Sequence, residues 1–500
     1  MLKSEDFSDR SPLLDSGDGE TAVNEGAGQR RISRGTSYCI IGVLFVVNLI
    51  NYMDRYTVAG VLDMVQPYYG LNSSQDGLIQ TVFVITYMIC SPMFGYLGDR
   101  YSRKYLMVVG ILFWSGITLA SSFIDKDHFW VFLMLRALVG VGEASYVTVA
   151  PTIIADLFHD SMRTIMLIIF NVAVPCGSGL GYIVGSNVAK LLGGWQWALR
   201  VTPGFGVICA ILILILPEPT RGSADGGTNL NKTSFLQDLK ELFTNKTLVL
   251  SSLGFTCVAF VTGTLALWAP IFIHDSMIFQ ERTVQQSSDS VSLIFGVITV
   301  VAGLTGVAIG GETSRRLKTR YPRADPIICA GGMIVGAPLL FFALYVCRYN
   351  TTVAWVLIFF GETAVCINWS IVNDILLYVV IPTRRALASA GQIFVCHALG
   401  DASSPYIVGL VSDALAKGYS QPATTPIVQF ATLQIALYVT PFVSVLGGTF
   451  FLAASMFVVE DRNAAERATE IVYTPPEVDD EQVELPKNDF LPADLSYSVN

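Results

Sequence analysis

The chain has 500 residues, of which 52% are hydrophobic and only 14% are charged, and its net charge is −9. Average soluble domains carry about 25% charged residues, so this composition excludes an ordinary soluble protein. Apolar runs of about twenty residues match the thickness of a bilayer and indicate a polytopic helical membrane protein. No basic patch interleaved with aromatic residues occurs, so we expect no nucleic-acid partner.

Twelve apolar runs predict twelve transmembrane helices, at 37–66, 76–97, 105–124, 129–150, 164–187, 198–217, 247–273, 291–311, 326–346, 352–377, 386–411 and 432–458. The first run is longer than a bilayer requires, so it should tilt or leave the membrane at its end. Most Lys and Arg residues fall on the side of the two chain ends, which places both termini in the cytosol.

The runs divide into two groups of six, and we predict the following organisation: a disordered cytosolic tail at 1–35, a six-helix half at 36–217, a cytosolic linker at 218–246, a second six-helix half at 247–458 and a disordered cytosolic tail at 459–500. The linker ends in "SFLQDLKELF", which predicts a short amphipathic helix at the membrane surface. The nine cysteines show no CxxC spacing and the four histidines are scattered, so we expect no metal and no cofactor.

The first tail contains "DRSPLL", in which an acid, Asp9, is followed by the leucine pair Leu13 and Leu14. This spacing fits the acidic dileucine pattern that clathrin adaptors read when they sort proteins to endosomes and lysosomes. We therefore predict a sorting signal here, although a pattern this short also occurs by chance.

The first span carries "NLINYMDRYTVAG", which places Asp54 and Arg55 within an apolar helix. Adjacent positions on a helix point about 100° apart, so the two charges do not simply neutralise each other. A membrane carboxylate near an arginine is a natural proton site, and we predict that Asp54 couples protons and Arg55 meets a substrate headgroup. The alternative is a pair at a helix end in the membrane interface.

After the second span comes "GYLGDRYSRK", in which Gly95 permits close helix approach and Asp99 can accept hydrogen bonds from a neighbouring helix end. Arg100, Arg103 and Lys104 would hold the loop to that helix and to anionic headgroups. This string resembles the loop signature of the major facilitator superfamily, and the resemblance implies a gating loop; the alternative is a basic loop that only fixes orientation.

The fourth span contains "LRALVGVGEASY", in which Arg136 and Glu143 are seven residues apart and so share one helix face. Gly140 and Gly142 keep the helix narrow between them. A charge at membrane depth costs at least ~2.5–3.5 kcal/mol on insertion scales, so it should face a cavity or a partner. We predict anion binding by Arg136 and proton exchange at Glu143, with a structural ion pair as the alternative.

The second half repeats parts of this pattern. Gly361 and Glu362 in the tenth span echo Gly142 and Glu143, and Asn368 follows Glu362 in the same span. The eleventh span carries His397, which could relay protons or simply pack. Repeated halves with polar residues at membrane depth are typical of transporters that alternate access.

These strings resemble the spinster family of the major facilitator superfamily: "NYMDRYTVAGVL", "FGYLGDRYSRKYLM", "LVGVGEASY", "GSGLGY", "DILLYVVIPTRR" and "GDASSPY". The resemblance runs from about residue 36 to residue 458. It implies an all-α membrane protein with the major facilitator fold, twelve transmembrane helices in two six-helix halves. Asn171, Ser403 and the missing acid after Arg385 depart from the family's pattern, and they affect the expected substrate more than the fold.

The resemblance implies a proton-dependent lipid transporter that exports lysophospholipids (lysophosphatidylcholine and lysophosphatidylethanolamine) from lysosome to cytosol. The alternative is a sphingosine-1-phosphate exporter, with the plasma membrane as the alternative location to the late endosome or lysosome. We expect a monomer among membrane lipids. We also expect no enzymatic activity, because no Ser/His/Asp arrangement is evident; a lipid enzyme and a non-transporting sensor are the readings from other classes.

The sequence thus predicts two sets of functional residues at membrane depth. The proton-coupling set is Asp54, Glu143 and His397, and the headgroup set is Arg55, Arg136, Glu362 and Asn368.

Overall fold

The computed structural model describes residues 33–158, 160–219, 235–280, 288–381, 384–419 and 425–473. Within these ranges the regular structure is helical and no strand occurs. Twelve of the helical segments are long and apolar enough to cross a membrane, which confirms the predicted number of spans.

The first six spans form the N-terminal half: α1 (Arg34–Gly60) with the short α2 (Leu62–Tyr69), α3 (Ser73–Arg100), α4 (Arg103–Ser121), α5 (Phe129–Leu157), α6 (Asp160–Leu191) and α7 (Trp195–Ile215). The short α8 (Phe235–Thr244) precedes the second group. The C-terminal half contains α9 (Lys246–Phe279), α10 (Ser288–Leu317), α11 (Ala324–Val346), α12 (Thr351–Cys366), α13 (Asn368–Val379), α14 (Arg385–Cys396), the π-helical turn η3 (His397–Asp401), α15 (Ser404–Ala416), α16 (Pro426–Leu437) and α17 (Val439–Tyr473).

Several spans that read as single apolar runs are broken. The first run divides at Val61, where the backbone leaves helical geometry between α1 and α2. The tenth run is assigned as two helices, α12 and α13, on either side of Ile367, which keeps helical backbone angles, and the eleventh widens into the π-helical turn η3. Apolar composition cannot reveal these breaks, because both sides of each break are equally hydrophobic.

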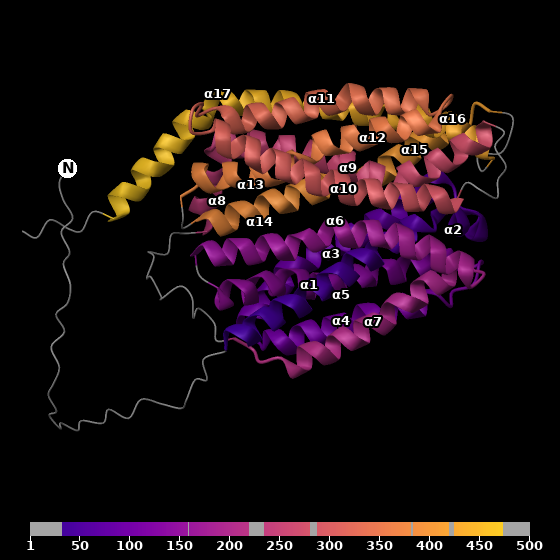
Figure 1. Cartoon of the computed structure of the whole chain (residues 1–500), viewed down its shortest axis with the longest axis horizontal. Coiled ribbons are helices and arrows are strands. Elements are labelled where there is room, and N and C mark those ends of the chain that lie inside the picture. The colour runs from indigo at the N-terminus through magenta and orange to yellow at the C-terminus, as the bar shows by residue number, and fades with distance from the viewer. Residues whose placement is uncertain are drawn as a thin grey trace, which may run out of the picture.

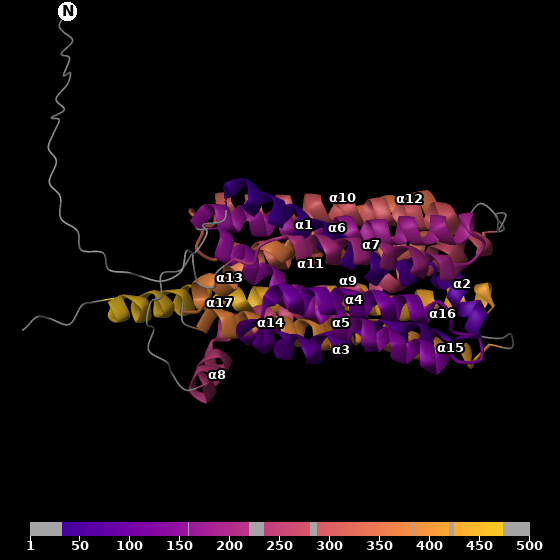
Figure 2. The same cartoon turned by 90° about the horizontal axis from the view of Figure 1, so that it is seen from below.

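The helices run roughly along one direction (Figures 1 and 2). We call the end at which α1 begins and α17 ends the tail end, and the opposite end, which carries α2, the far end. The amphipathic α8 lies at the tail end and projects sideways from the bundle in Figure 2. This placement agrees with a short helix that rests at a membrane surface.

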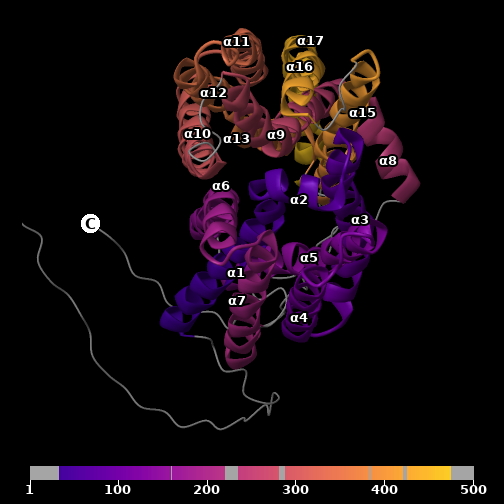
Figure 3. The ribbon, with the colours of Figure 1, turned by 90° about the vertical axis from the view of Figure 1, so that its right-hand side faces the viewer.

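Seen along the bundle, α1 to α7 and α9 to α17 form two groups that face each other (Figure 3). Two pairs of helices join them, because α3 packs against α15 and α6 packs against α10. The hydrogen bonds between the groups include Thr81 Oγ1 to the Ala402 carbonyl at 2.6 Å and Tyr182 Oη to the Ala266 carbonyl at 2.5 Å.

The α3–α15 contact becomes very close towards the far end, and we call it the far-end seam. A Cβ placed on Gly77 of α3 would lie 2.4 Å from the Pro405 carbonyl oxygen, and one on Gly409 of α15 would lie 2.3 Å from the Ser73 carbonyl oxygen. Only glycine permits this approach. The two halves are therefore pressed together at the far end in this conformation.

Candidate functional site

An ion pair joins the two halves near the middle of the bundle. Arg55 of α1 donates from Nη2 to Oδ2 of Asp401, the last residue of η3, at 3.2 Å. The other carboxylate oxygen lies 2.8 Å from Nδ1 of His397, one π turn earlier. Both ends of the pair are largely buried, with 7% and 15% of the Arg55 and Asp401 side chains exposed. Removing one partner of such a pair leaves an uncompensated buried charge.

Aromatic rings surround the Arg55 guanidinium. Its central carbon lies 6.0 Å from the Tyr52 ring centroid, 5.9 Å from that of Tyr56 and 5.1 Å from that of Phe83. Ring faces attract a cation without consuming its N–H donors. Arg55 Nε is buried and has no hydrogen-bond partner in this conformation.

Asp54 points in a different direction, as the angle between adjacent helical residues predicts. Its carboxylate is fully buried inside the N-terminal half, where it accepts hydrogen bonds from Thr118 of α4 at 3.0 Å and from Thr202 of α7 at 2.6 Å. Asp54 also acts electrostatically on Arg136 of α5. It is therefore held between helices of one half, whereas Arg55 faces the other half.

Glu143 and Arg136 are both buried on α5, with 1% and 2% of their surfaces exposed. With its amide nitrogen turned towards Glu143, Asn51 of α1 donates to both carboxylate oxygens, at 2.9 and 3.2 Å. Arg136 lies 5.9 Å from the Phe83 ring, and its Nε and Nη1 have no hydrogen-bond partner. The described residues contain no ion pair within 4.0 Å between Arg136 and Glu143, so their attraction acts over a longer distance.

These residues form one group, which we call the central charge cluster: Asp54, Arg55, Arg136, Glu143, His397 and Asp401. Asp54, Arg55 and Arg136 all act on Glu143, so the members are electrostatically connected. A proton gained or lost at one of them changes the energy of the others. The sequence suggested no role for Asp401, because only the folded chain shows that it meets Arg55.

The other two predicted headgroup residues lie apart. Glu362 is half-buried on α12 and acts on Tyr182 across the interface, but it takes part in no ion pair among the described residues. Asn368 is fully buried, donates to the Val365 carbonyl at 2.9 Å and packs beside Gly332 of α11. Asn368 therefore serves the local packing of a helix break, and the structure does not bring it to the cluster.

The predicted gating loop is clamped to the N-terminal half at the tail end. Glu218 accepts hydrogen bonds from the Arg103 backbone N–H at 2.8 Å and from Ser102 Oγ at 2.5 Å. Arg103 also forms an ion pair with Asp156, and Lys104 donates to the Leu216 carbonyl at 2.9 Å. The loop thus ties the start of α4 to the ends of α5 and α7.

The residues before α4 in the predicted gating loop differ in how they contact the rest of the protein. Arg100 stacks over Tyr96 at 4.3 Å, and the Asp99 side chain lies outside the described part of the structure. The close approach predicted for Gly95 is wrong for this conformation, because nothing lies within 4 Å of a Cβ built there. Gly98, one turn later, lies against Val149 instead.

The sorting residues Asp9, Leu13 and Leu14 fall outside the described residues.

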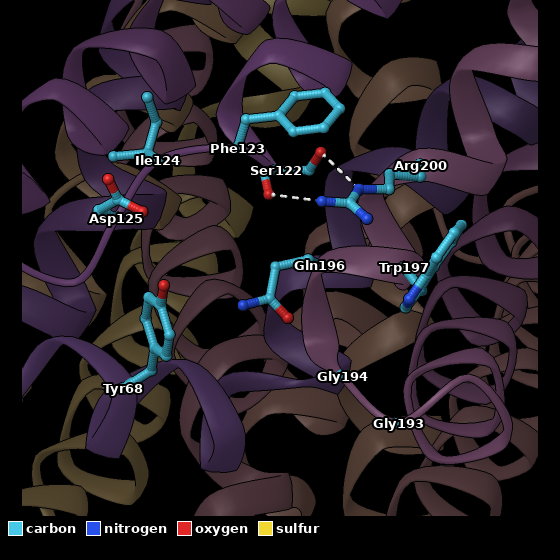
Figure 4. Close-up of a pocket in the computed structure, with 10 residues that line it drawn as sticks. All are labelled: Tyr68, Ser122, Phe123, Ile124, Asp125, Gly193, Gly194, Gln196, Trp197 and Arg200. Carbon is cyan, nitrogen blue, oxygen red and sulfur yellow. Dashed lines mark hydrogen bonds between the residues drawn. The ribbon is translucent and has the colours of Figure 1, made fainter.

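A separate cavity of about 310 Å³ opens at the far end of the N-terminal half (Figure 4). Arg200 on its wall donates to the Ser122 hydroxyl at 3.1 Å and to the Ser122 carbonyl at 3.3 Å, next to the end of α4. The second bond gives the Ser122 carbonyl, at the C-terminal end of α4, a hydrogen-bond partner. Because the cavity involves one half only and no member of the central charge cluster lines it, we do not assign it as the functional centre.

Comparison with known proteins shows the family of the chain. Residues 44–405 match the family model described as the Major Facilitator Superfamily. Spinster homolog 1 of Rattus norvegicus is 49% identical over 488 residues, which cover 95% of this chain and 92% of the relative. The Homo sapiens homolog is 51% identical, with 89% and 86% covered. The chain belongs to the spinster family of the major facilitator superfamily.

Solved structures confirm the fold of this spinster-family chain. A bacterial homolog of the human lysosomal transporter spinster, crystallised in an inward-facing and unoccupied conformation, superposes with a TM-score of 0.75 at 20% identity, covering 86% of this chain and 99% of that one. The xylose transporter XylE from E. coli gives a TM-score of 0.60 at 17% identity, covering 83% and 95%. The predicted family and fold are therefore confirmed, and the protein is a multi-pass transporter.

Proposed function

We propose that this spinster-family protein is a proton-dependent exporter that moves lysophospholipids, such as lysophosphatidylcholine and lysophosphatidylethanolamine, from the lysosome to the cytosol by alternating access. The observation that carries the proposal is the Arg55–Asp401–His397 arrangement, which connects the two halves beside the buried Glu143. An ion pair between moving halves, next to groups that can take up protons, links substrate and proton to the same motion.

The proposal places the tail end in the cytosol. The tail end carries Arg100, Arg103 and Lys104, and basic residues prefer the cytosolic side. The tightly packed far-end seam then faces the lumen, and the conformation corresponds to a transporter closed towards the lumen. Location in late endosomes or lysosomes, with both termini cytosolic, belongs to this proposal, as does the reading of Asp9, Leu13 and Leu14 as a clathrin-adaptor signal.

Arg55 is better placed than Arg136 to meet a lipid phosphate. Arg136 is enclosed in the N-terminal half between Phe83 and two carboxylates, so its charge is needed there to compensate Asp54 and Glu143. Arg55 faces the other half and keeps an unused N–H. A guanidinium suits a phosphate, because it donates two parallel hydrogen bonds. A phosphate at Arg55 would displace Asp401, and a proton on Asp401 or His397 would then neutralise the freed carboxylate.

The test is transport of labelled lysophosphatidylcholine in proteoliposomes with an imposed pH gradient. We expect Glu143→Gln to remove the acceleration by the gradient while residual exchange persists. A Glu312→Gln variant, which alters an exposed carboxylate at the tail end of α10, serves as the matched control. If Glu143→Gln keeps the full response to the gradient, Glu143 is not the coupling group. If no lysophospholipid is transported under any gradient, the substrate class is wrong.

Sphingosine-1-phosphate is the second candidate substrate, because the same phosphate chemistry at Arg55 would hold its headgroup. Competition between the two lipids in one set of proteoliposomes separates the candidates. Loss of lysosomal location after a Leu13→Ala and Leu14→Ala double substitution would support the sorting signal, and unchanged location would refute it.

A further inference from the structure

The far-end seam contains a carboxylate that the central charge cluster does not use. Asp76 of α3 has 0% of its surface exposed, and the hydrogen-bond partner of its carboxylate is the neutral side chain of Gln66 on α2. It precedes Gly77, the residue at which α3 touches α15. A buried carboxylate whose described hydrogen-bond partner is a neutral side chain is disfavoured in its charged form. Asp76 is thus enclosed by the contact that closes the far end.

The neighbours of Asp76 add repulsion. Asp413 of α15 and Asp275 of α9, both on the opposite half, are negative groups that act on it, and Gln66 of α2 is its polar neighbour in its own half. On α5, which also packs along α3, the first charged residue is Arg136, two helical turns further along beside Phe83. The nearby charges that come from the opposite half therefore oppose a negative Asp76.

Asp413 is itself committed to the seam. Its two carboxylate oxygens accept the backbone N–H groups of Ser73 and Ser74, at 3.0 and 2.9 Å. These are the first residues of α3, so one half supplies a cap for a helix of the other half. Both Asp413 oxygens are thus engaged by backbone N–H groups, whereas no described backbone N–H contacts the Asp76 carboxylate.

A second titratable group lies at the same end of the interface. Asp275 is 4% exposed, one of its oxygens lies 3.3 Å from Nδ1 of His274, and the other has no hydrogen-bond partner. Asp63 of α2 acts on both residues from the N-terminal half. His274 and Asp63 line a small cavity between the halves together with Ser292, which donates to the Gly60 carbonyl at 3.3 Å.

We propose that the far-end seam is a second proton-binding site, in which Asp76 and the His274–Asp275 pair bind protons when the halves close and release them when the far end opens. A neutral Asp76 removes the repulsion from Asp413 and Asp275, and a protonated His274 compensates Asp275 and Asp63. Acid on the far side therefore closes the far end. This site is independent of the lipid and of the central charge cluster, and it would give the pH of that compartment direct control of the conformation.

The experiment measures the far-end distance without any lipid substrate. Spin labels are attached at Lys126→Cys and Tyr349→Cys, two exposed positions at the far ends of the two halves, in full-length protein in nanodiscs that lacks the exposed Cys39. The closed fraction is followed from about pH 7.5 to about pH 5, the interval in which perturbed carboxyl and imidazole groups titrate. We expect acid to increase the closed fraction of the unsubstituted protein several-fold.

Asp76→Asn should give a closed fraction near the acid value already at neutral pH, with the response to acid reduced at least twofold. Asp275→Asn should reduce the response by a smaller amount. Asp127→Asn, a change at an exposed far-end carboxylate, is the matched control and should leave the response unchanged. Asp413→Ala should lower the closed fraction at every pH, because the two hydrogen bonds that join the start of α3 to the other half are lost.

The proposal is overturned if Asp76→Asn and Asp275→Asn both keep the full response, or if Glu143→Gln alone abolishes it. Asparagine is close in size to aspartate, and an unchanged thermal midpoint confirms that a variant is folded. Failure of lysophospholipid transport leaves this measurement unaffected, so the two proposals can be refuted separately.

Discussion

The two halves carry the same Gly-Glu pair, at Gly142–Glu143 and at Gly361–Glu362, but they use it differently. Gly142 lets α5 approach Trp114, and Gly361 lets α12 approach Leu340, so both glycines serve packing within a half. Glu143 then lies among Asp54, Arg55 and Arg136, whereas Glu362 has no ion pair in the described part of the chain. The two glycines thus serve the same kind of packing in both halves, whereas of the two glutamates Glu143 is the one that lies among charged groups.

The largest effect should follow from breaking the ion pair between Arg55 and Asp401, which joins the halves. We expect Arg55→Ala to reduce transport at least a hundredfold, because truncating one partner of a buried pair costs about 3–5 kcal/mol. Arg55→Lys should recover part of the activity. Arg348→Ala removes a cation that lies 5.2 Å from the Phe279 ring in the C-terminal half, and its transport in proteoliposomes should stay near the unsubstituted level. Equal losses in both alanine variants would contradict the special role of Arg55.

The seam offers a place where the halves should behave alike. Gly77→Ala and Gly409→Ala each add a methyl group where backbone lies within 2.4 Å, so each should keep the far end open and slow transport roughly tenfold by overpacking the contact. Gly116→Ala is the control, since nothing lies within 4 Å of a Cβ there. Spin-label distances and transport rates check the expectation. If either substitution leaves the spin-label distance and the transport rate unchanged, close packing at the seam does not control opening of the far end.

Each half has an ion pair at the tail end, and the pair in the N-terminal half is more buried than the pair in the C-terminal half. The side chains of Arg103 and Asp156 are 8% and 12% exposed, whereas those of Lys318 and Asp374, 3.3 Å apart, are 39% and 48% exposed. Exposed pairs contribute about 0–1 kcal/mol, so Lys318→Ala should leave the thermal midpoint almost unchanged. Arg103→Ala should lower it by several degrees, because it leaves Asp156 without that cation. Thermal unfolding in detergent measures both, and a reversed order would refute the comparison.

The smallest effect is expected at the second glutamate. Glu362→Gln should change transport by no more than about twofold and keep the response to a pH gradient, because no cation among the described residues forms an ion pair with that carboxylate. The measurement is the same proteoliposome assay used for Glu143→Gln. If Glu362→Gln abolishes the response to the gradient, the coupling does not reside in the N-terminal half.

The sequence predicted those features that depend on local helix geometry. The length of the apolar runs predicts the twelve spans. Helical spacing predicts that Arg136 and Glu143 share a helix face and that Asp54 and Arg55 do not. The Arg55–Asp401 pair joins residues 346 positions apart, and it depends on how one half is placed on the other. No periodicity encodes that placement. For the same reason the sequence could not predict that Asn368 lies outside the central charge cluster. Nor could it predict that Gly98, and not Gly95, lies against a neighbouring helix.

The cap that Asp413 supplies to α3 gives the molecule a built-in reporter. While the halves are closed, the Ser73 and Ser74 amides are held by a carboxylate from the other half, and when the halves part these amides are released to solvent. Their hydrogen exchange should therefore be slow in one state and fast in the other, since Asn72 satisfies only Gln75 at that helix start. Two backbone protons would record how often an unlabelled transporter opens, and the far end could be timed without adding any probe.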